Sequence, residues 1–286
     1  MGNESSKSKS PGAKVTSALG IKTGPSQTTI QKHMDNAQKS RILQLKSCGL
    51  RSVPPSLHEL RDVIRNLELS QNQIKELPPT IGGFSLLKQL HLSENLLSEL
   101  PDEIGALKNL EVLNLQRNML TSLPDAIAGC YSLRTLNVSS NKFSQFPMSV
   151  CYLASLETLL LEQNTITELP TQVSSLNVSE LNLNRNRLNS LNADSLAKCA
   201  HLKILRVEEN CLAKTEFSME LLSSSTVSII CYSGNVSGTE FSMELLSSST
   251  VSIICYSGNV FQEREFQDLP GYEHYQERFT ATRRKM

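Results

Sequence analysis

The side chains best suited to metal binding or nucleophilic catalysis are the five histidines and seven cysteines, and their spacing favours neither kind of site. The histidines lie far apart, and none belongs to an HExxH or comparable ligand pattern. The cysteines are odd in number and include no CxxC pair, which argues against a disulfide framework and a cysteine-rich zinc site. There is also no GxSxG nucleophile elbow, P-loop or kinase signature set. We therefore expect a protein that is not an enzyme and binds no metal or cofactor.

A covalent modification is predicted at the N-terminus, where Gly2 and Ser6 match the M-G-x-x-x-[ST] signal for N-myristoylation. One myristoyl chain binds a membrane only weakly, with an association constant on the order of 10⁴ M⁻¹. Lys7, Lys9 and Lys14 would strengthen attachment to an anionic surface. The alternative is a free tail whose second residue happens to be glycine. The motif predicts reversible attachment to the cytoplasmic face of a membrane.

Composition and charge exclude several other classes of protein. Lys plus Arg and Asp plus Glu are equal at 28 each, so net charge gives no support to a nucleic-acid partner. No run of 18 apolar residues is present, and the polar N-terminus does not resemble a signal peptide. We expect a cytoplasmic protein, a monomer, that binds no nucleic acid.

The side chains just considered are embedded in a repeat of about 23 residues, Leu-x-Leu-x-x-Asn-x-Leu or Ile. The strong copies centre on Asn72, Asn95, Asn118, Asn141, Asn164, Asn186 and Asn210. A weaker first copy has Cys48 at the asparagine position, and Asn235 and Asn259 head two weak copies at the far end. The Leu-x-Leu alternation predicts a short strand with leucines pointing inward. Because one repeat cannot bury its own leucines, neighbouring repeats must stack.

A second signature follows each asparagine turn. It is a Leu-Pro or Phe-Pro pair, such as Leu100-Pro101 or Phe146-Pro147, followed by apolar residues three apart. That spacing suits a short helix or 3₁₀ segment on the outer face. The predicted fold is therefore an α/β leucine-rich-repeat solenoid, a curved rod with a parallel strand ladder on its concave face.

Three regions are expected along the chain. Residues 1–27 form a basic, serine-rich tail predicted to be disordered, which carries the acylation signal. Residues 28–260 form the solenoid, with an amphipathic cap helix over roughly 28–42. Residues 261–286 form a C-terminal cap, rich in aromatic residues, and a basic tail.

An internal duplication interrupts the C-terminal part of the solenoid. Residues 215–236 reappear without one change as residues 239–260, whereas the other repeats share only their framework positions. Packing does not require such identity. Two explanations remain open: a recent tandem duplication, or an error in the gene model. A unit of 24 residues is one full repeat, so a solenoid could absorb it as an extra coil.

Outward-facing strand positions, counted back from each asparagine, form columns on the predicted concave face. The residues expected to contact a partner there are His91, Glu94, Asn114, Arg117, Asn137, Glu162, Asn182, Arg185, Arg206 and Glu208. The three arginines are the candidate anchors, because arginine is enriched among residues that dominate interfaces. For any one of these residues the alternative is a solvated strand face, but curved solenoids bind through this face as a whole.

The repeat frame LPxxIxxLxxLxxLxLxxNxL resembles that of cytosolic leucine-rich-repeat scaffolds such as the Ras-suppressor group. Residues 33–39, 181–184, 202–210 and 271–282 look closer still to the family of leucine-rich repeat-containing protein 57, relative to which residues 4–31 look like an insertion. The resemblance implies a lipid-anchored, non-catalytic protein. By analogy alone, it implies a partner from a phosphatase or small-GTPase pathway. Two hypotheses follow: a membrane-associated adaptor that binds a protein on the concave face, or a structural membrane-surface spacer with no specific partner there.

Overall fold

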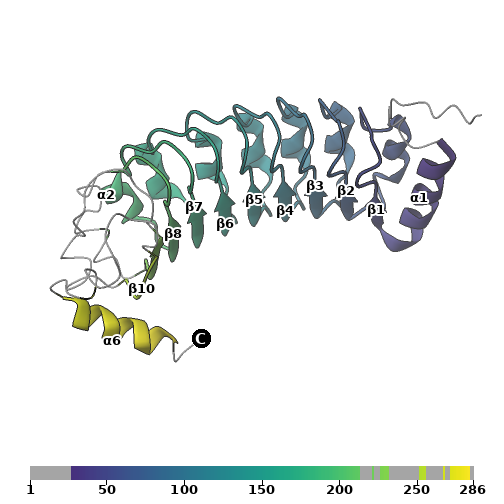
Figure 1. Cartoon of the computed structure of the whole chain (residues 1–286). Helices are drawn as coiled ribbons and strands as arrows, with labels where there is room; N and C mark the ends of the chain where they lie inside the picture. The colour runs from purple at the N-terminus through teal and green to yellow at the C-terminus, as the bar shows by residue number, and fades with distance from the viewer. Residues whose placement is uncertain are drawn as a thin grey trace, which may run out of the picture.

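The computed structural model describes residues 27–212, 221, 226–231, 251–255, 267 and 271–283. The predicted acylation site Gly2, most of the duplicated unit, and most of residues 261–270 lie outside these ranges. The described chain forms an arch in which strands follow the inner side and short helical segments the outer side (Figure 1). The predicted leucine-rich-repeat solenoid is confirmed.

The inner side is one parallel sheet, built from ten three-residue strands within the described residues and ordered as in the sequence. The strands are β1 (Ile42–Gln44), β2 (Asn66–Glu68), β3 (Gln89–His91), β4 (Val112–Asn114), β5 (Thr135–Asn137), β6 (Thr158–Leu160), β7 (Glu180–Asn182), β8 (Ile204–Arg206), β9 (Ile229–Cys231) and β10 (Ile253–Cys255). The middle residue of each of β1 to β9 is buried while its neighbours are mostly part-exposed, as period-two alternation requires. Strands β9 and β10 come from the two copies of the duplicated unit and pair in register, Ile229 with Ile253.

The outer side carries mainly 3₁₀ segments, which confirms the prediction from the Leu-Pro signature. They are η1 (Pro55–Leu60), η2 (Pro79–Gly83), η3 (Asp102–Ala106), η4 (Asp125–Gly129), η5 (Met148–Tyr152) and η6 (Thr171–Ser175), followed by the short helix α2 (Ala193–Leu196). The proline before each segment is extended; Pro101, for example, has φ −71° and ψ 152°. Proline is therefore the last extended residue after the asparagine turn, and the 3₁₀ segment begins at the residue that follows it.

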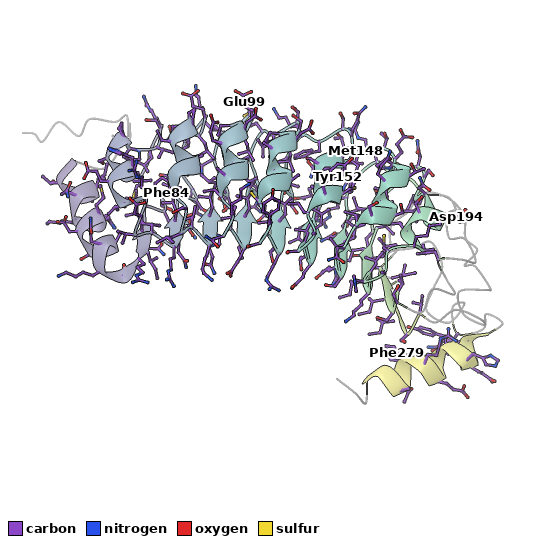
Figure 2. The ribbon with its side chains drawn as sticks, turned by 180° about the vertical axis from the view of Figure 1, so that it is seen from behind. Phe84, Glu99, Met148, Tyr152, Asp194 and Phe279 are labelled. Carbon is purple, nitrogen blue, oxygen red and sulfur yellow. The ribbon has the colours of Figure 1, made fainter. Side chains whose placement is uncertain are left out.

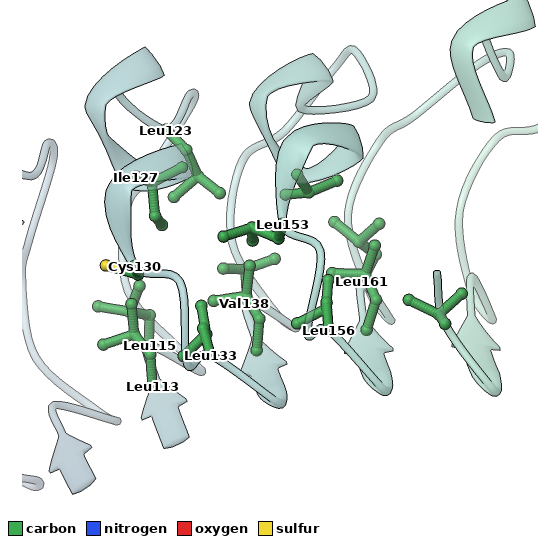
Figure 3. Close-up of a cluster of buried hydrophobic side chains, with 14 of the residues drawn as sticks. Leu113, Leu115, Leu123, Ile127, Cys130, Leu133, Val138, Leu153, Leu156 and Leu161 are labelled. Atoms are coloured by element: carbon green, nitrogen blue, oxygen red, sulfur yellow. The ribbon is translucent and has the colours of Figure 1, made fainter. Parts of the chain in front are cut away.

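Successive outer segments pack almost backbone to backbone. A Cβ placed on Gly105 of η3 would lie 2.0 Å from the carbonyl oxygen of Ala126 on η4. Glycine is therefore required at this position for lack of space. The close approach lets neighbouring repeats share the apolar core, in which Leu113, Leu133 and Leu156 are fully buried (Figure 3).

A ladder of side-chain amides holds the turns together. Asn118 donates from Nδ2 to the carbonyls of Leu92 (2.9 Å) and Leu115 (3.0 Å) and accepts at Oδ1 from the N–H of Leu97 (3.0 Å). The Leu92 carbonyl also accepts from Asn95 Nδ2 (3.0 Å). Each asparagine thus satisfies buried backbone groups of its own repeat and of the preceding one, which explains why the sequence returns to this residue type.

The two ends of the sheet are covered by helices. Helix α1 (Gln27–Ser40) contacts β1 and η1 and buries Met34 and Ala37. Helix α6 (Tyr272–Arg283) adds Tyr275 to the core, with Tyr272 and Phe279 packed against it (Figure 2). Arg278 Nε donates to the carbonyl of Val251, next to β10 (3.0 Å). The amphipathic pattern of residues 28–42 corresponds to α1. The predicted aromatic cap corresponds in part to α6; residues 261–266 and 268–270 of the predicted cap lie outside the described ranges.

Candidate partner-binding face

The predicted contact residues lie in three columns on the inner side of the arch. The first runs across the strands through the register pairs His91 with Asn114, Asn114 with Asn137, and Asn182 with Arg206. Leu160 of β6 fills the same column between Asn137 and Asn182. Glu162 and Glu208 stand two residues further along their repeats. Glu94, Arg117 and Arg185 immediately precede the turn asparagines. The structure therefore brings all ten predicted residues to one face.

The column beside the turns has an unusual backbone. Glu94, Arg117 and Arg185 have φ values of 56°, 54° and 56°, in the left-handed region that residues with a Cβ rarely adopt. Each backbone N–H donates to the next repeat; that of Arg117, for example, reaches the Ser139 carbonyl at 2.9 Å. These inter-repeat bonds stabilise the strained conformation, so the three charged side chains project from a rigid support.

All three candidate anchor arginines are paired with acids of neighbouring repeats. Arg117 Nη1 lies 3.6 Å from Glu94 Oε1, and Arg206 Nε lies 3.0 Å from Glu180 Oε1. Arg185 Nε lies 3.0 Å from Glu209 Oε1, and this hydrogen bond is the main reason that the pKa of Arg185 is raised. The face thus carries a network of ion pairs between neighbouring repeats rather than a cluster of unpaired cations.

The sequence analysis did not predict all the residues of this network of ion pairs. Glu180 was not among the predicted contact residues, although it starts β7 and lies on the same face as Asn182, two residues on. Residues that immediately precede the strands form a further column, which contains two more ion pairs. Lys88 pairs with Glu111 (2.5 Å between Nζ and Oε1), and Arg134 pairs with Glu157. The available signal was the presence of opposite charges 23 residues apart. Counting back seven residues from each asparagine, rather than four, would have identified these four residues.

The asparagines of the first column are oriented by their own backbone. Oδ1 of Asn114 accepts from the N–H of Gln116 (3.1 Å), and Oδ1 of Asn137 from that of Ser139 (3.0 Å). Asn182 repeats the contact with Asn184 (3.0 Å). Each amide therefore has a fixed rotamer, although all three side chains are only half-buried.

The described residues contain no grouping of three or more His, Cys, Asp or Glu side chains suited to a metal ion. Burial raises the pKa of Cys130, Cys151 and Cys199 to about 11, so these thiols are protonated at neutral pH and poor nucleophiles. On the outer side, an apolar hollow of about 430 Å³ is lined by Val53, Pro54, Pro55, Leu57, His58, Pro78, Thr80, Ile81 and Phe84. Two of these side chains, His58 and Thr80, are polar, so the hollow offers few groups to orient a ligand.

Within the described ranges, no helix is both long enough and apolar enough to cross a membrane.

Comparison with known proteins agrees with this geometry. The family described as "Leucine rich repeat" matches residues 85–143, a range that contains β3, η3, β4, η4 and β5. The chain is built of leucine-rich repeats. A leucine-rich-repeat protein of Leptospira interrogans is similar in structure, with a TM-score of 0.62 and 25% sequence identity over 85% of this chain and 73% of that one.

Two plant proteins share the fold at lower identity. The plant peptide hormone receptor RGFR1 has a TM-score of 0.51 and 24% identity over 64% of this chain and 34% of the receptor. The leucine-rich-repeat ectodomain of the receptor kinase GASSHO1/SCHENGEN3 from Arabidopsis thaliana has a TM-score of 0.50 and 23% identity over 73% of this chain and 31% of that one. This leucine-rich-repeat chain thus spans about a third of each plant structure.

Proposed function

We propose that this chain is a non-catalytic adaptor that binds a protein partner on the concave face of its leucine-rich repeats. The observation that carries the proposal is the set of three columns over β3 to β8, where ten polar or charged side chains share one half-buried or exposed face. Hydrogen bonds between repeats hold the backbone of the column beside the turns, and all three arginines are already in ion pairs. A partner therefore meets a preorganised surface, which lowers the cost of ordering side chains on binding.

The polar character of the face suits a reversible protein interaction. Non-obligate interfaces are about as polar as the rest of a protein surface, and arginine is enriched at their energetic centres. In the similar plant structures, RGFR1 is in complex with RGF2 and GASSHO1 with CASPARIAN STRIP INTEGRITY FACTOR 2. Those structures are examples of the fold carrying a ligand, at identities that support the fold alone.

The finer part of the proposal concerns the membrane. The M-G-x-x-x-[ST] signal at Gly2 supports N-myristoylation, which together with Lys7 and Lys9 would hold the solenoid reversibly at the cytoplasmic face of a membrane. The resemblance to the family of leucine-rich repeat-containing protein 57 and to the Ras-suppressor group supports a lipid-anchored scaffold. It also suggests a phosphatase or small-GTPase pathway component as the partner.

One experiment tests the membrane part by itself. The full chain is expressed in human cells with an alkyne analogue of myristic acid, and the label and the membrane fraction are measured for the wild type and for Gly2→Ala. We expect label and membrane association in the wild type and loss of both in the variant. An unlabelled wild-type protein would overturn the membrane role and leave the adaptor role standing.

A second experiment tests the concave face. Cross-linking partners of the wild type are compared with those of a variant carrying Arg117→Glu, Arg185→Glu and Arg206→Glu. Arg134→Glu is the matched control, because it breaks the pair with Glu157 at the strand-start edge, outside the three columns. Loss of a partner in the triple variant alone supports the adaptor. Equal partner capture by all three proteins supports the alternative, a membrane-surface spacer with no specific partner on this face.

A further inference from the structure

The first column of the concave face presents hydrogen-bond donors. The Oδ1 atoms of Asn114, Asn137 and Asn182 each face a backbone N–H, which can only donate. The other end of each amide is therefore the NH₂ group. Within the described residues these three Nδ2 atoms make no hydrogen bond, although each side chain is half-buried. No buried side-chain nitrogen or oxygen lacks a partner among the described residues, so these three Nδ2 atoms are open to solvent and an acceptor on a ligand can reach them.

The same column has little to offer a ligand that brings donors of its own. Each Oδ1 atom already uses one of its two lone pairs for a backbone N–H, and Leu160, between Asn137 and Asn182, is apolar and half-buried. The order along the ladder from β4 to β7 is donor, donor, leucine, donor. The complementary ligand carries a row of acceptors interrupted by an apolar group. The main-chain carbonyls of a peptide rich in proline have this character, because proline has no N–H.

The spacing of the column selects a conformation for that peptide. Neighbouring strands lie about 4.8 Å apart, so Asn137 on β5 and Asn182 on β7 are separated by roughly 9.6 Å. A polyproline II helix advances about 9.3 Å in its three-residue turn, and all of its carbonyls are free of internal hydrogen bonds. A β-extended peptide repeats its carbonyl direction every two residues, about 6.7 Å, which matches neither one strand step nor two.

We propose that Asn137, Leu160 and Asn182 bind a proline-containing peptide segment in the polyproline II conformation. Carbonyls three residues apart accept from Asn137 and Asn182, and the residues between them pack on Leu160. The inference deepens the proposed function, on which it rests, by naming the chemistry of the partner and the column that reads it. The arginine pairs flank this column and act on the side chains of the partner.

The probe is a phage-displayed library of random linear 15-residue peptides, selected on the full chain; the selected peptides are then synthesised and their affinities measured. The decisive variants are Asn137→Asp and Asn182→Asp. Aspartate keeps the oxygen that accepts from Ser139 or Asn184 and replaces the outward NH₂ group by a second acceptor. Gln172→Glu is the control, since it makes the same amide-to-acid change at an exposed position of η6, on the outer side of the arch. Circular dichroism checks that all three variants fold as the wild type does.

We expect the selected peptides to contain proline and to bind each aspartate variant at least tenfold more weakly, with Gln172→Glu within about threefold of the wild type. Replacing two backbone amides three residues apart by esters, which are weaker acceptors, should also weaken binding. Selection of no peptide, or of peptides that bind the aspartate variants as tightly as the wild type, overturns the proposal. If the aspartate variants also keep a cross-linked partner that the triple arginine variant loses, the adaptor stands and this inference alone falls.

Discussion

Arg206 on β8 and Glu180 on β7 are joined by an ion pair in which Nε lies 3.0 Å from Oε1. The two residues are 26 positions apart, whereas residues in one column here are separated by 22 to 24. The pair therefore crosses diagonally from the last residue of one strand to the first residue of the preceding one. Its side chains are 35% and 28% exposed, the least exposed of the ion pairs among the described residues. The contact thus links two neighbouring repeats through the ion pair that is best shielded from water.

We predict a measurable coupling between Arg206 and Glu180. A double-mutant cycle with Arg206→Gln and Glu180→Gln should give about 0.5–1 kcal/mol in the free energy of unfolding, the upper range for surface pairs, because both side chains are mostly shielded from solvent. Urea unfolding at low and high salt measures it, and salt should reduce it. Arg61 and Asp62, which are 57% and 76% exposed, provide a reference pair with coupling near zero. Equal coupling in the two pairs would contradict the prediction.

A second prediction concerns acid titration at the strand starts. The hydrogen bond from Lys88 is the main cause that lowers the pKa of Glu111 below its ordinary value of 4.5. Because the folded pKa is lowered, the stabilising effect is present above pH 4.5 and is lost as the pH falls through the folded value. Carbon-detected NMR of the Glu111 carboxyl should show the lowered pKa in the wild type and a return toward the ordinary value in Lys88→Met. An unchanged titration in that variant would mean that Lys88 does not cause the shift.

The repeat frame made the concave face predictable because position in a solenoid follows from sequence spacing. Once Asn95, Asn118 and Asn141 set the period, period-two alternation places His91, Asn114 and Asn137 in one column, as the strand register has them. The lateral contacts were harder to predict. Whether Arg206 pairs with Glu180 or with Glu208 depends on the rotamers of two long side chains and on the diagonal offset of the strands, which residue spacing does not specify.

The close packing of the outer segments predicts a strong position effect for glycine. Gly105→Ala should lower the free energy of unfolding by about 1–3 kcal/mol, because the new Cβ would meet the Ala126 carbonyl and the backbone must move. Gly83→Ala is the matched change at the end of η2, where the added Cβ would have Arg61 Cδ at 3.8 Å as its nearest neighbour. That variant should be neutral or slightly stabilised through the unfolded chain. Thermal unfolding of both proteins checks the contrast, and similar losses in both would refute the steric explanation.

The amide ladder predicts destabilisation that is more than additive. Asn118→Ala leaves the buried N–H of Leu97 without its acceptor and should cost about 2–3 kcal/mol. The carbonyl of Leu92 still accepts from Asn95, so one substitution leaves it satisfied. The double variant with Asn95→Ala removes both donors to this carbonyl, and its cost should exceed the sum of the single costs. Urea unfolding of the three variants measures this coupling. Strict additivity would show that the carbonyl does not depend on the two amides.

The buried cysteines predict both low reactivity and a loss of stability at alkaline pH. The pKa of Cys130, Cys151 and Cys199 is about 11, so roughly one of these thiols in a thousand is ionised at pH 8. Alkylation mapped by mass spectrometry should therefore spare these three cysteines, while the exposed Cys211 reacts.

The folded pKa of the three buried cysteines lies above the unfolded value of 9.0. The stabilising effect is therefore complete below pH 9 and is lost as the pH rises toward 11. Replacing the three buried cysteines by alanine should lower stability at neutral pH and flatten the decline of stability between pH 9 and 11. An equally steep decline in that variant would assign the effect to other groups.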